Sequence, residues 1–214
     1  VQYGRTKVGV AISTLGNHEF DWNVPTLLGL LETAEHPVIS ANIFVEGTQE
    51  RPEWVVPTAT LEVAGYTIGF IGITTPETKG IVLAANVEGL EFADPAPVIN
   101  AEAKALREAG ADLVVVVTHG AANQGEEPLE VVSEVADWMA QVTEQVDAIT
   151  GAHSHEMAAG YVLDANGNQV PAVQSGAHST GLARIDLYIN RADKQVTKAA
   201  VDVWNPSQAL APTP

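Results

Sequence analysis

Apolar residues recur along the chain in short runs, separated by polar and glycine-rich stretches, which predicts strands that alternate with helices. The least interrupted run, Tyr66 to Ile73, predicts a buried central strand, although Gly69 and Gly72 weaken it unless another backbone comes close. Val8 to Ile12 fits either a strand or a helix. Shorter runs predict strands at Pro37–Asn42, Asp112–Val117 and Asp147–Thr150, with one or two more between Trp54 and Leu61.

Three segments have the spacing and the end signals of helices. Asn23, with Pro25 in the first turn, predicts one start, and Asp94-Pro95 predicts another helix that ends at Gly110. A third helix is predicted over Pro128–Val146. Its apolar side is Leu129, Val132, Ala136, Met139 and Val146, and its solvated acidic side is Glu130, Glu134, Asp137 and Gln141. The strand–helix–strand order predicts βαβ units in an α/β fold.

The last part of the chain has the pattern of antiparallel strands. Residues 161–173 are interrupted by Asn166-Gly167, which predicts a hairpin. Apolar and polar residues alternate from Ala183 to Ile189, and Val196–Val203 is able to pair with that strand. We therefore expect one domain over residues 1–205 and a linker or disordered tail over residues 206–214, which contain three prolines.

Composition narrows the class of protein. The 214 residues are 46% hydrophobic and 17% charged, which suits one folded domain. A net charge of −17 argues against nucleic acid or an anionic membrane surface as a partner. No apolar run approaches the roughly 18 residues of a membrane-spanning helix, so we expect no membrane insertion. The absence of cysteine excludes disulfides and thiolate metal ligands.

The densest polar cluster is the string Gly16 to Trp22, which places an amide, an imidazole and two carboxylates among bulky apolar residues. Burying such groups is costly unless they have partners. Asn17 and His18 can each bind a divalent cation, and Asp21 can orient the His18 imidazole. The same segment also fits a polar turn after a strand, in which Asn and Gly have their ordinary roles.

Three further histidines follow predicted strands. His119 comes soon after Asp112–Val117, and His153 and His155 come soon after Asp147–Thr150. Open α/β sheets bind ligands at the carboxyl ends of their strands, and residues two apart in an extended segment face the same way. Imidazole is a suitable ligand for Zn, Mn or Co. These histidines are therefore candidate metal ligands.

For each histidine the alternative is a core or surface side chain whose partner is the backbone. We prefer that alternative for His36, and we give His178 at most an outer role beside the ligands. Asn42 is interpreted as a turn residue rather than a ligand, and Glu77 and Glu91 as solvated charges.

The motifs around these residues resemble the 5'-nucleotidase family of calcineurin-like metallophosphoesterases. Together with the string at Gly16, Thr118–Gly120 and Gly151–Glu156 look like metal motifs of the calcineurin-like group as a whole. The narrower resemblance to 5'-nucleotidases is carried by three strings that stand in family order, which are Gly16–Trp22, Thr74–Thr78 and Gln174–Leu187. The resemblance implies an α/β fold, the four-layer αββα sandwich. It also implies that Asn17, His119 and His153 hold one metal ion and that His155 serves a second. His18 and Asp21 would form a catalytic dyad beside the phosphate.

The function implied is a metal-dependent phosphoesterase that hydrolyses nucleotides by two-metal activation of water, with Mn, Zn or Co as the ions. The type would be 5'-nucleotidase or 2',3'-cyclic-nucleotide phosphodiesterase, located outside the cytoplasm. A hydrolase of nucleotide sugars or sulfur esters is an alternative on the same domain. Substrate-binding residues stay unknown, because in this family they belong to a C-terminal domain that we expect in a longer parent chain.

The chain departs from the family at its beginning. Family members start with an Asp-x-His motif and a Gly-Asp, which supply metal ligands and the carboxylate that bridges the two ions. Residues 1–18 contain no Asp or Glu. We therefore expect a partial domain that lacks its first strand and metal loop, and that holds one ion or none. A non-catalytic or vestigial metal-binding fragment is the alternative function.

Overall fold

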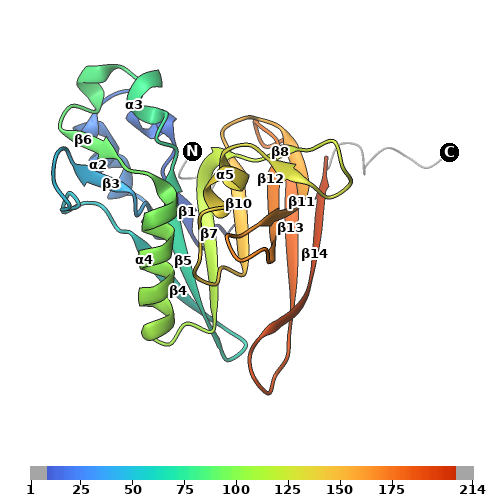
Figure 1. The fold of residues 1–214 in the computed structure, drawn as a ribbon. Coiled ribbons are helices and arrows are strands. Elements are labelled where there is room, and N and C mark those ends of the chain that lie inside the picture. The colour runs from blue at the N-terminus through green and yellow to red at the C-terminus, as the bar shows by residue number, and fades with distance from the viewer. Residues whose placement is uncertain (1–8, 206–214) are drawn as a thin grey trace.

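A six-stranded mixed sheet lies at the centre of the computed structural model, which describes residues 9–205 (Figure 1). The first eight residues and the tail predicted for residues 206–214 lie outside the described part. The strand order is β11-β12-β10-β7-β5-β4, with four parallel inner strands and two antiparallel edge strands. The bounds are β4 Thr58–Val63, β5 Tyr66–Thr74, β7 Leu113–Ala121, β10 Ala148–Ala152, β11 Met157–Leu163 and β12 Gln169–Ser175.

Strand β5 lies between two layers, and its glycines show why. A Cβ at Gly69 would meet Leu106 of α4 (Pro95–Glu108) at 2.9 Å, whereas a Cβ at Gly72 would meet the backbone of Ile39 in β2 (Val38–Ile39) at 2.4 Å. Residues three apart in a strand point to opposite faces. Helix α4 therefore covers one face of the sheet and β2 the other, which confirms that other elements approach both glycines closely.

At its β11 edge, too, the sheet is covered by different elements on its two faces. A Cβ at Gly160 in β11 would meet the backbone of Leu129, near α5 (Glu134–Met139), which shares its apolar core with α4. The next residue, Tyr161, donates its hydroxyl to the carbonyl of Ala199 at 3.0 Å. Ala199 belongs to β14 (Val196–Trp204), which pairs with β13 (Leu182–Ile189) beside β11 and β12 (Figure 1). The β13–β14 hairpin and the β1–β2 pair thus form an incomplete second β layer, as a partial αββα sandwich requires.

Short elements complete the described part of the chain. They are β1 Ser13–Thr14, η1 Asn17–Phe20, α2 Val24–Leu31, β3 Ile43–Val45, α3 Thr78–Ile81, η2 Ala84–Asn86, β6 Leu90–Phe92, β8 Asn123–Gln124 and β9 Val131–Val132. Strand β1 pairs with β2 in parallel, and β3–β6 and β8–β9 are antiparallel pairs.

Two of the three predicted helices are confirmed together with their starts. The Asn23 side chain accepts a hydrogen bond from the Thr26 amide at 2.8 Å at the start of α2. Asp94 accepts one from the Ala96 amide at 3.2 Å at the start of α4. Both predicted hairpin pairings, β11–β12 and β13–β14, are also confirmed.

The helix predicted over Pro128–Val146 is wrong. The segment forms β9 and then α5, which covers Glu134–Met139 alone. Leu129 and Ser133 have φ angles of 65° and 81°, and the right-handed α-helix excludes such angles. Leu129 turns the chain before β9, and Ser133 turns it between β9 and α5. Leu129, expected in the buried face, is therefore 55% exposed.

Candidate functional site

The polar string at Gly16 is anchored at both ends. Glu19 accepts a hydrogen bond from the Gly16 amide at 2.7 Å, which starts the one-turn helix η1. Phe20 is fully buried and meets the Phe92 ring edge-on, with 5.3 Å between ring centroids. This short helix leaves Asn17 only 6% exposed, facing inward. The segment is therefore more than a surface turn.

Asn17 and His119 are 102 residues apart in sequence and lie in direct contact, with 2.8 Å between Asn17 Oδ1 and His119 Nε2. Their approach depends on Gly16, because a Cβ there would lie 2.6 Å from His119 Nδ1 and 2.8 Å from two ring carbons. The His119 imidazole thus packs against a bare backbone. His119 itself is the seventh residue of β7, near the carboxyl end of that strand.

His153 and His155 follow β10, the parallel neighbour of β7, so the predicted meeting of strand ends brings them near His119. The His119 and His153 ring centroids are 5.2 Å apart. His155 lies beside His178 instead, with 5.3 Å between centroids. His153 and His155 have φ angles of 68° and 64°, in the left-handed region that non-glycine residues seldom occupy. The surrounding structure must hold this turn.

The imidazole of His119 is held in its neutral form. Burial, followed by the nearby imidazoles of His153, His18 and His155, lowers the pKa of His119 from 6.5 to about 4. Since these three imidazoles affect the pKa of His119, the four side chains lie near one another. They are called the cluster below, and its members are His18, His119, His153 and His155. A neutral imidazole at neutral pH keeps a nitrogen lone pair available for a metal ion.

His18 and Asp21 form the pair expected from their spacing. His18 Nδ1 lies 2.8 Å from Asp21 Oδ2, and their side chains are 70% and 48% exposed. The contact uses the Nδ1 atom, so Nε2 is the nitrogen left to meet a ligand. The His18–Asp21 pair lies at the solvent-exposed edge of the site, whereas the adjacent Asn17 is buried.

The remaining predicted residues take other places. His36 Nε2 lies 3.0 Å from the Ser13 hydroxyl, away from the other histidines. Asn42, interpreted as a turn residue, is fully buried and bonds both the amide and the carbonyl of Thr74, so its role is to join the segment between β2 and β3 to the end of β5. Glu77 is 61% exposed but lies 3.4 Å from His153 Nε2. Glu77, interpreted from the sequence as a solvated charge, is thus a second carboxylate, besides Asp21, that lies against one of these histidines.

Sequence reasoning missed two residues beside the cluster. Glu134, assigned to a solvated face, instead accepts hydrogen bonds from the Thr75 hydroxyl at 2.6 Å and the Ala121 amide at 2.8 Å. Gln174, 1% exposed, accepts from the Ala122 amide and donates to the loop after β10. Gln174 stood in a recognised motif, which was the one available signal.

The side chains at this site supply part of a ligand set for one cation. Within residues 9–205, no group of three or more histidine, aspartate or glutamate side chains is placed to hold a metal ion. An amide oxygen and an imidazole nitrogen do meet, in Asn17 and His119, at 2.8 Å. Two donors bound to one ion at about 2.1 Å and at right angles lie about 3 Å apart, so this spacing suits shared ligation. His153 stands beside them as a third donor.

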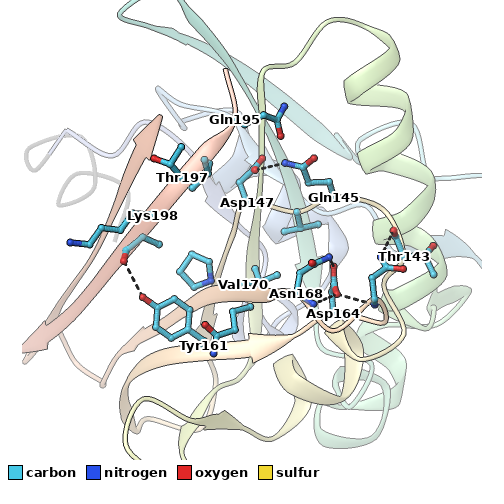
Figure 2. A pocket seen from close by; sticks show the side chains of 16 residues that line it. Thr143, Gln145, Asp147, Tyr161, Asp164, Asn168, Val170, Gln195, Thr197 and Lys198 are labelled. Atoms are coloured by element: carbon cyan, nitrogen blue, oxygen red, sulfur yellow. Dashed lines mark hydrogen bonds between the residues drawn. The ribbon is translucent and has the colours of Figure 1, made fainter. Parts of the chain in front are cut away.

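A separate polar hollow of about 620 Å³ lies between the segment that precedes β10, strand β12 and strand β14 (Figure 2). Its walls include Asp147, just before β10, and Lys198 in β14. His153 follows the opposite end of β10, so the hollow and the histidines are at opposite ends of that strand. Asp147 and Asp164 in its wall are bonded to neighbouring protein groups.

Comparison with protein families gives one match. The family described as "Bacterial capsule synthesis protein PGA_cap" matches residues 6–166. Similar curated proteins are endonuclease YhcR of Bacillus subtilis (27% identical over 210 residues, 92% of this chain), cell wall protein Lmo0130 of Listeria monocytogenes (29% over 184 residues, 73%) and a 5'-nucleotidase of Vibrio cholerae (31% over 201 residues, 89%). The chain spans 16%, 23% and 36% of the lengths of these relatives.

Solved structures with the same fold support the layered arrangement. A 5'-nucleotidase precursor from Thermus thermophilus superposes with a TM-score of 0.80 at 22% identity, covering 95% of this chain and 40% of that one. The calcineurin-like phosphoesterase YfkN from Bacillus subtilis gives 0.79 at 21% identity, covering 97% and 67%. The fold class predicted from the sequence is thereby confirmed.

Proposed function

We propose a function from one premise: the chain belongs to the PGA_cap family and is a 5'-nucleotidase-like domain of the calcineurin-like metallophosphoesterases. On that premise, the protein hydrolyses phosphoester bonds of nucleotides with the help of a divalent cation. Its substrates are nucleoside 5'-monophosphates or 2',3'-cyclic nucleotides. The observation that carries this proposal is the meeting of Asn17, His119 and His153 where β7 and β10 end.

The proposed ligands of one cation are the Asn17 amide oxygen, His119 Nε2 and the imidazole of His153. His155, on the same left-handed turn, would serve a second ion. When bound, such ions polarise the phosphoryl group and supply a nucleophile from water. The protein's own part is to keep His119 neutral and to hold Asn17 and His119 at adjacent positions, which the burial of Asn17 and the partial burial of His119 support.

We propose that His18, oriented by Asp21, stabilises negative charge and donates a proton at the phosphate. Asp21 fixes Nδ1 of His18, so the imidazole presents Nε2. In its protonated form His18 would stabilise the charge on the phosphoryl oxygens or donate a proton to the departing oxygen. Its exposure at the rim lets it meet a substrate that arrives from solvent.

The overall charge makes cations a requirement of the proposal. At a net charge of −17 the protein repels an anionic phosphate ester at long range. Bound ions would reverse the sign of the potential locally, as the neutral imidazole of His119 cannot. The same charge disfavours a polynucleotide substrate, although one relative is named an endonuclease.

A second candidate function is a non-catalytic metal-binding domain. It is favoured by the finding that the described part of the chain places no histidine and carboxylate group around a metal position. Under this proposal the same Asn17, His119 and His153 would bind an ion without turnover.

We propose an extracytoplasmic location for the protein. Support comes from the similarity to a protein named as a cell wall protein. Between residues 9 and 205 there is no helix long and apolar enough to cross a membrane.

Hydrolysis of phosphoesters tests the two candidates. Purified protein would be assayed on AMP, 2',3'-cyclic AMP, p-nitrophenyl phosphate and single-stranded DNA, with Mn²⁺, Zn²⁺ or Co²⁺ and with a chelator. Phosphate release follows the monoesters, whereas chromatography follows 2',3'-cyclic AMP and DNA, because opening a phosphodiester releases a monoester and no phosphate. We expect cation-dependent hydrolysis of a nucleotide that His119→Ala and His153→Ala abolish. His36→Gln, at a histidine outside the cluster, is the matched control and should keep its activity. Cation binding by calorimetry without hydrolysis of any substrate would establish the second candidate, and the absence of both would refute both.

A further inference from the structure

The end of β7, which carries His119, is held by two side chains from elsewhere in the chain. The amides of Ala121 and Ala122 are consecutive, and each donates to a side-chain oxygen rather than to a strand. Ala121 N donates to Glu134 Oε2 at 2.8 Å, and Ala122 N donates to Gln174 Oε1 at 3.0 Å. We propose that Glu134 and Gln174 are positioning residues that fix the end of β7, with His119, relative to the turn after β10, with His153 and His155.

Gln174 extends this link to the loop after β10. Its Nε2 donates to the Ser154 hydroxyl at 2.8 Å and to the Glu156 carbonyl at 2.9 Å. The orientation of the amide is set by these partners, since a backbone N–H must meet its oxygen and a backbone carbonyl its nitrogen. Ser154 separates His153 from His155. One buried side chain therefore joins the end of β7, which carries His119, to the turn that carries His153 and His155.

The turn needs such support. His153 and His155 are both left-handed, and non-glycine residues keep that conformation when surrounding groups determine it. Ser154, between them, donates its amide to the Ala152 carbonyl at 2.7 Å. The two Gln174 bonds hold the turn at its centre and at its end. They account for a strained conformation that the local sequence does not favour.

Glu134 makes the corresponding link on the other side. Its Oε1 accepts a hydrogen bond from the Thr75 hydroxyl at 2.6 Å, directly after β5. Thr75 is fully buried and donates its own amide to the His119 carbonyl at 3.1 Å. Glu134 and Gln174 thus join the carboxyl ends of β5, β7 and β10 through bonds that leave every imidazole free of them. Both act through the histidines rather than on a substrate.

Amide hydrogen exchange, followed residue by residue by NMR in the metal-free protein, tests the proposal directly. Gln174→Met keeps the side-chain length and removes every bond, so exchange should rise at least tenfold at Ala122 and at residues 154–156. Gln174→Glu keeps the acceptor for Ala122 and loses the donor to Glu156. It should therefore leave Ala122 protected while residues 154–156 exchange faster. Glu134→Gln should restore part of the protection at Ala121 that Glu134→Ala removes.

Val170→Ala is the matched control, since Val170 is a buried residue of the same strand as Gln174 and touches none of these loops through its hydrogen bonds. It should lower global stability without the local pattern.

Calorimetry with Mn²⁺ and Zn²⁺ adds a second readout, in which Gln174→Met should weaken binding by about 10- to 100-fold, as for other groups that orient metal ligands. This readout rests on the proposed metal site. If the wild type binds no cation, the proposed function fails while exchange still decides the positioning role. Exchange in Gln174→Met equal to that in Val170→Ala would overturn the proposal.

Discussion

Replacing Gly16 with alanine should disrupt the candidate metal site, because the added Cβ atom would collide with the His119 ring. The new Cβ would lie 2.6 Å from His119 Nδ1, whereas ordinary contacts begin at 3.4 Å. The ring must therefore withdraw by roughly 0.8 Å, since the short helix η1 is held by Glu19 and Phe20 and cannot move as easily. The 2.8 Å contact between Asn17 and His119 would open beyond hydrogen-bond range.

Two measurements follow from that displacement. Overpacking of a well-filled site costs about 1–3 kcal/mol, so the urea midpoint of Gly16→Ala should fall accordingly. Cation affinity should fall at least tenfold, because the two donors that share one position no longer lie together. Calorimetric titration with Mn²⁺ or Zn²⁺ gives the second quantity.

Gly29→Ala is the matched control. Gly29 lies in α2 with nothing within 4 Å of its added Cβ. Alanine there should stabilise the protein by about 0.5–1 kcal/mol and leave the cation titration unchanged. A Gly16→Ala protein that binds cations as tightly as the wild type would show that the contact between Asn17 and His119 is not a ligand position.

The remaining predictions concern acid, the core and a helix start. His119 has a pKa near 4 in the folded state and 6.5 when unfolded, so the unfolded state binds more protons between these pH values. The metal-free protein should therefore lose stability as the pH falls from 6.5 to 4. The loss should be at most about 3 kcal/mol, and less because the His119 ring is partly exposed. Urea unfolding at pH 7.5 and 5 should show this loss, and His119→Gln should reduce it. Asp147→Ala should cost about 3–5 kcal/mol, since the buried carboxylate accepts bonds from Arg107 and the Val114 amide; an unchanged urea midpoint would contradict this. Asn23→Ala should cost about 1 kcal/mol at the start of α2, and Asn23→Ser should recover most of it in the same assay.

The core of the fold was predictable because its signals are local. Buried parallel strands read as apolar runs, and Asn23 and Asp94 mark helix starts by bonds within their own first turns. The carboxyl ends of adjacent parallel strands must also meet, so the approach of His119 to the loop after β10 follows from the sequence. The contact with Asn17 does not, since nothing in a spacing of 102 residues indicates it. It was expected through the family resemblance alone.

The errors come from contacts that the local pattern does not contain. The apolar spacing from Pro128 to Val146 is helical, but Leu129 and Ser133 turn the chain through left-handed angles. Glu134 was placed on a solvated face because a lone acid on an amphipathic helix is usually exposed. Its partners, Thr75 and Ala121, come from the ends of two different strands. Such a role is visible only after the strands are assembled.

The separation of the candidate ligands along the chain has a thermodynamic consequence. A cation held by Asn17, His119 and His153 would find its ligands together in the native state alone, because an unfolded chain scatters them over more than a hundred residues. By mass action such an ion would then raise the melting temperature in step with its concentration, by an amount equivalent to about 2.7 kcal/mol at a hundredfold excess over the dissociation constant. Heat resistance would in that way report the metal supply around the protein.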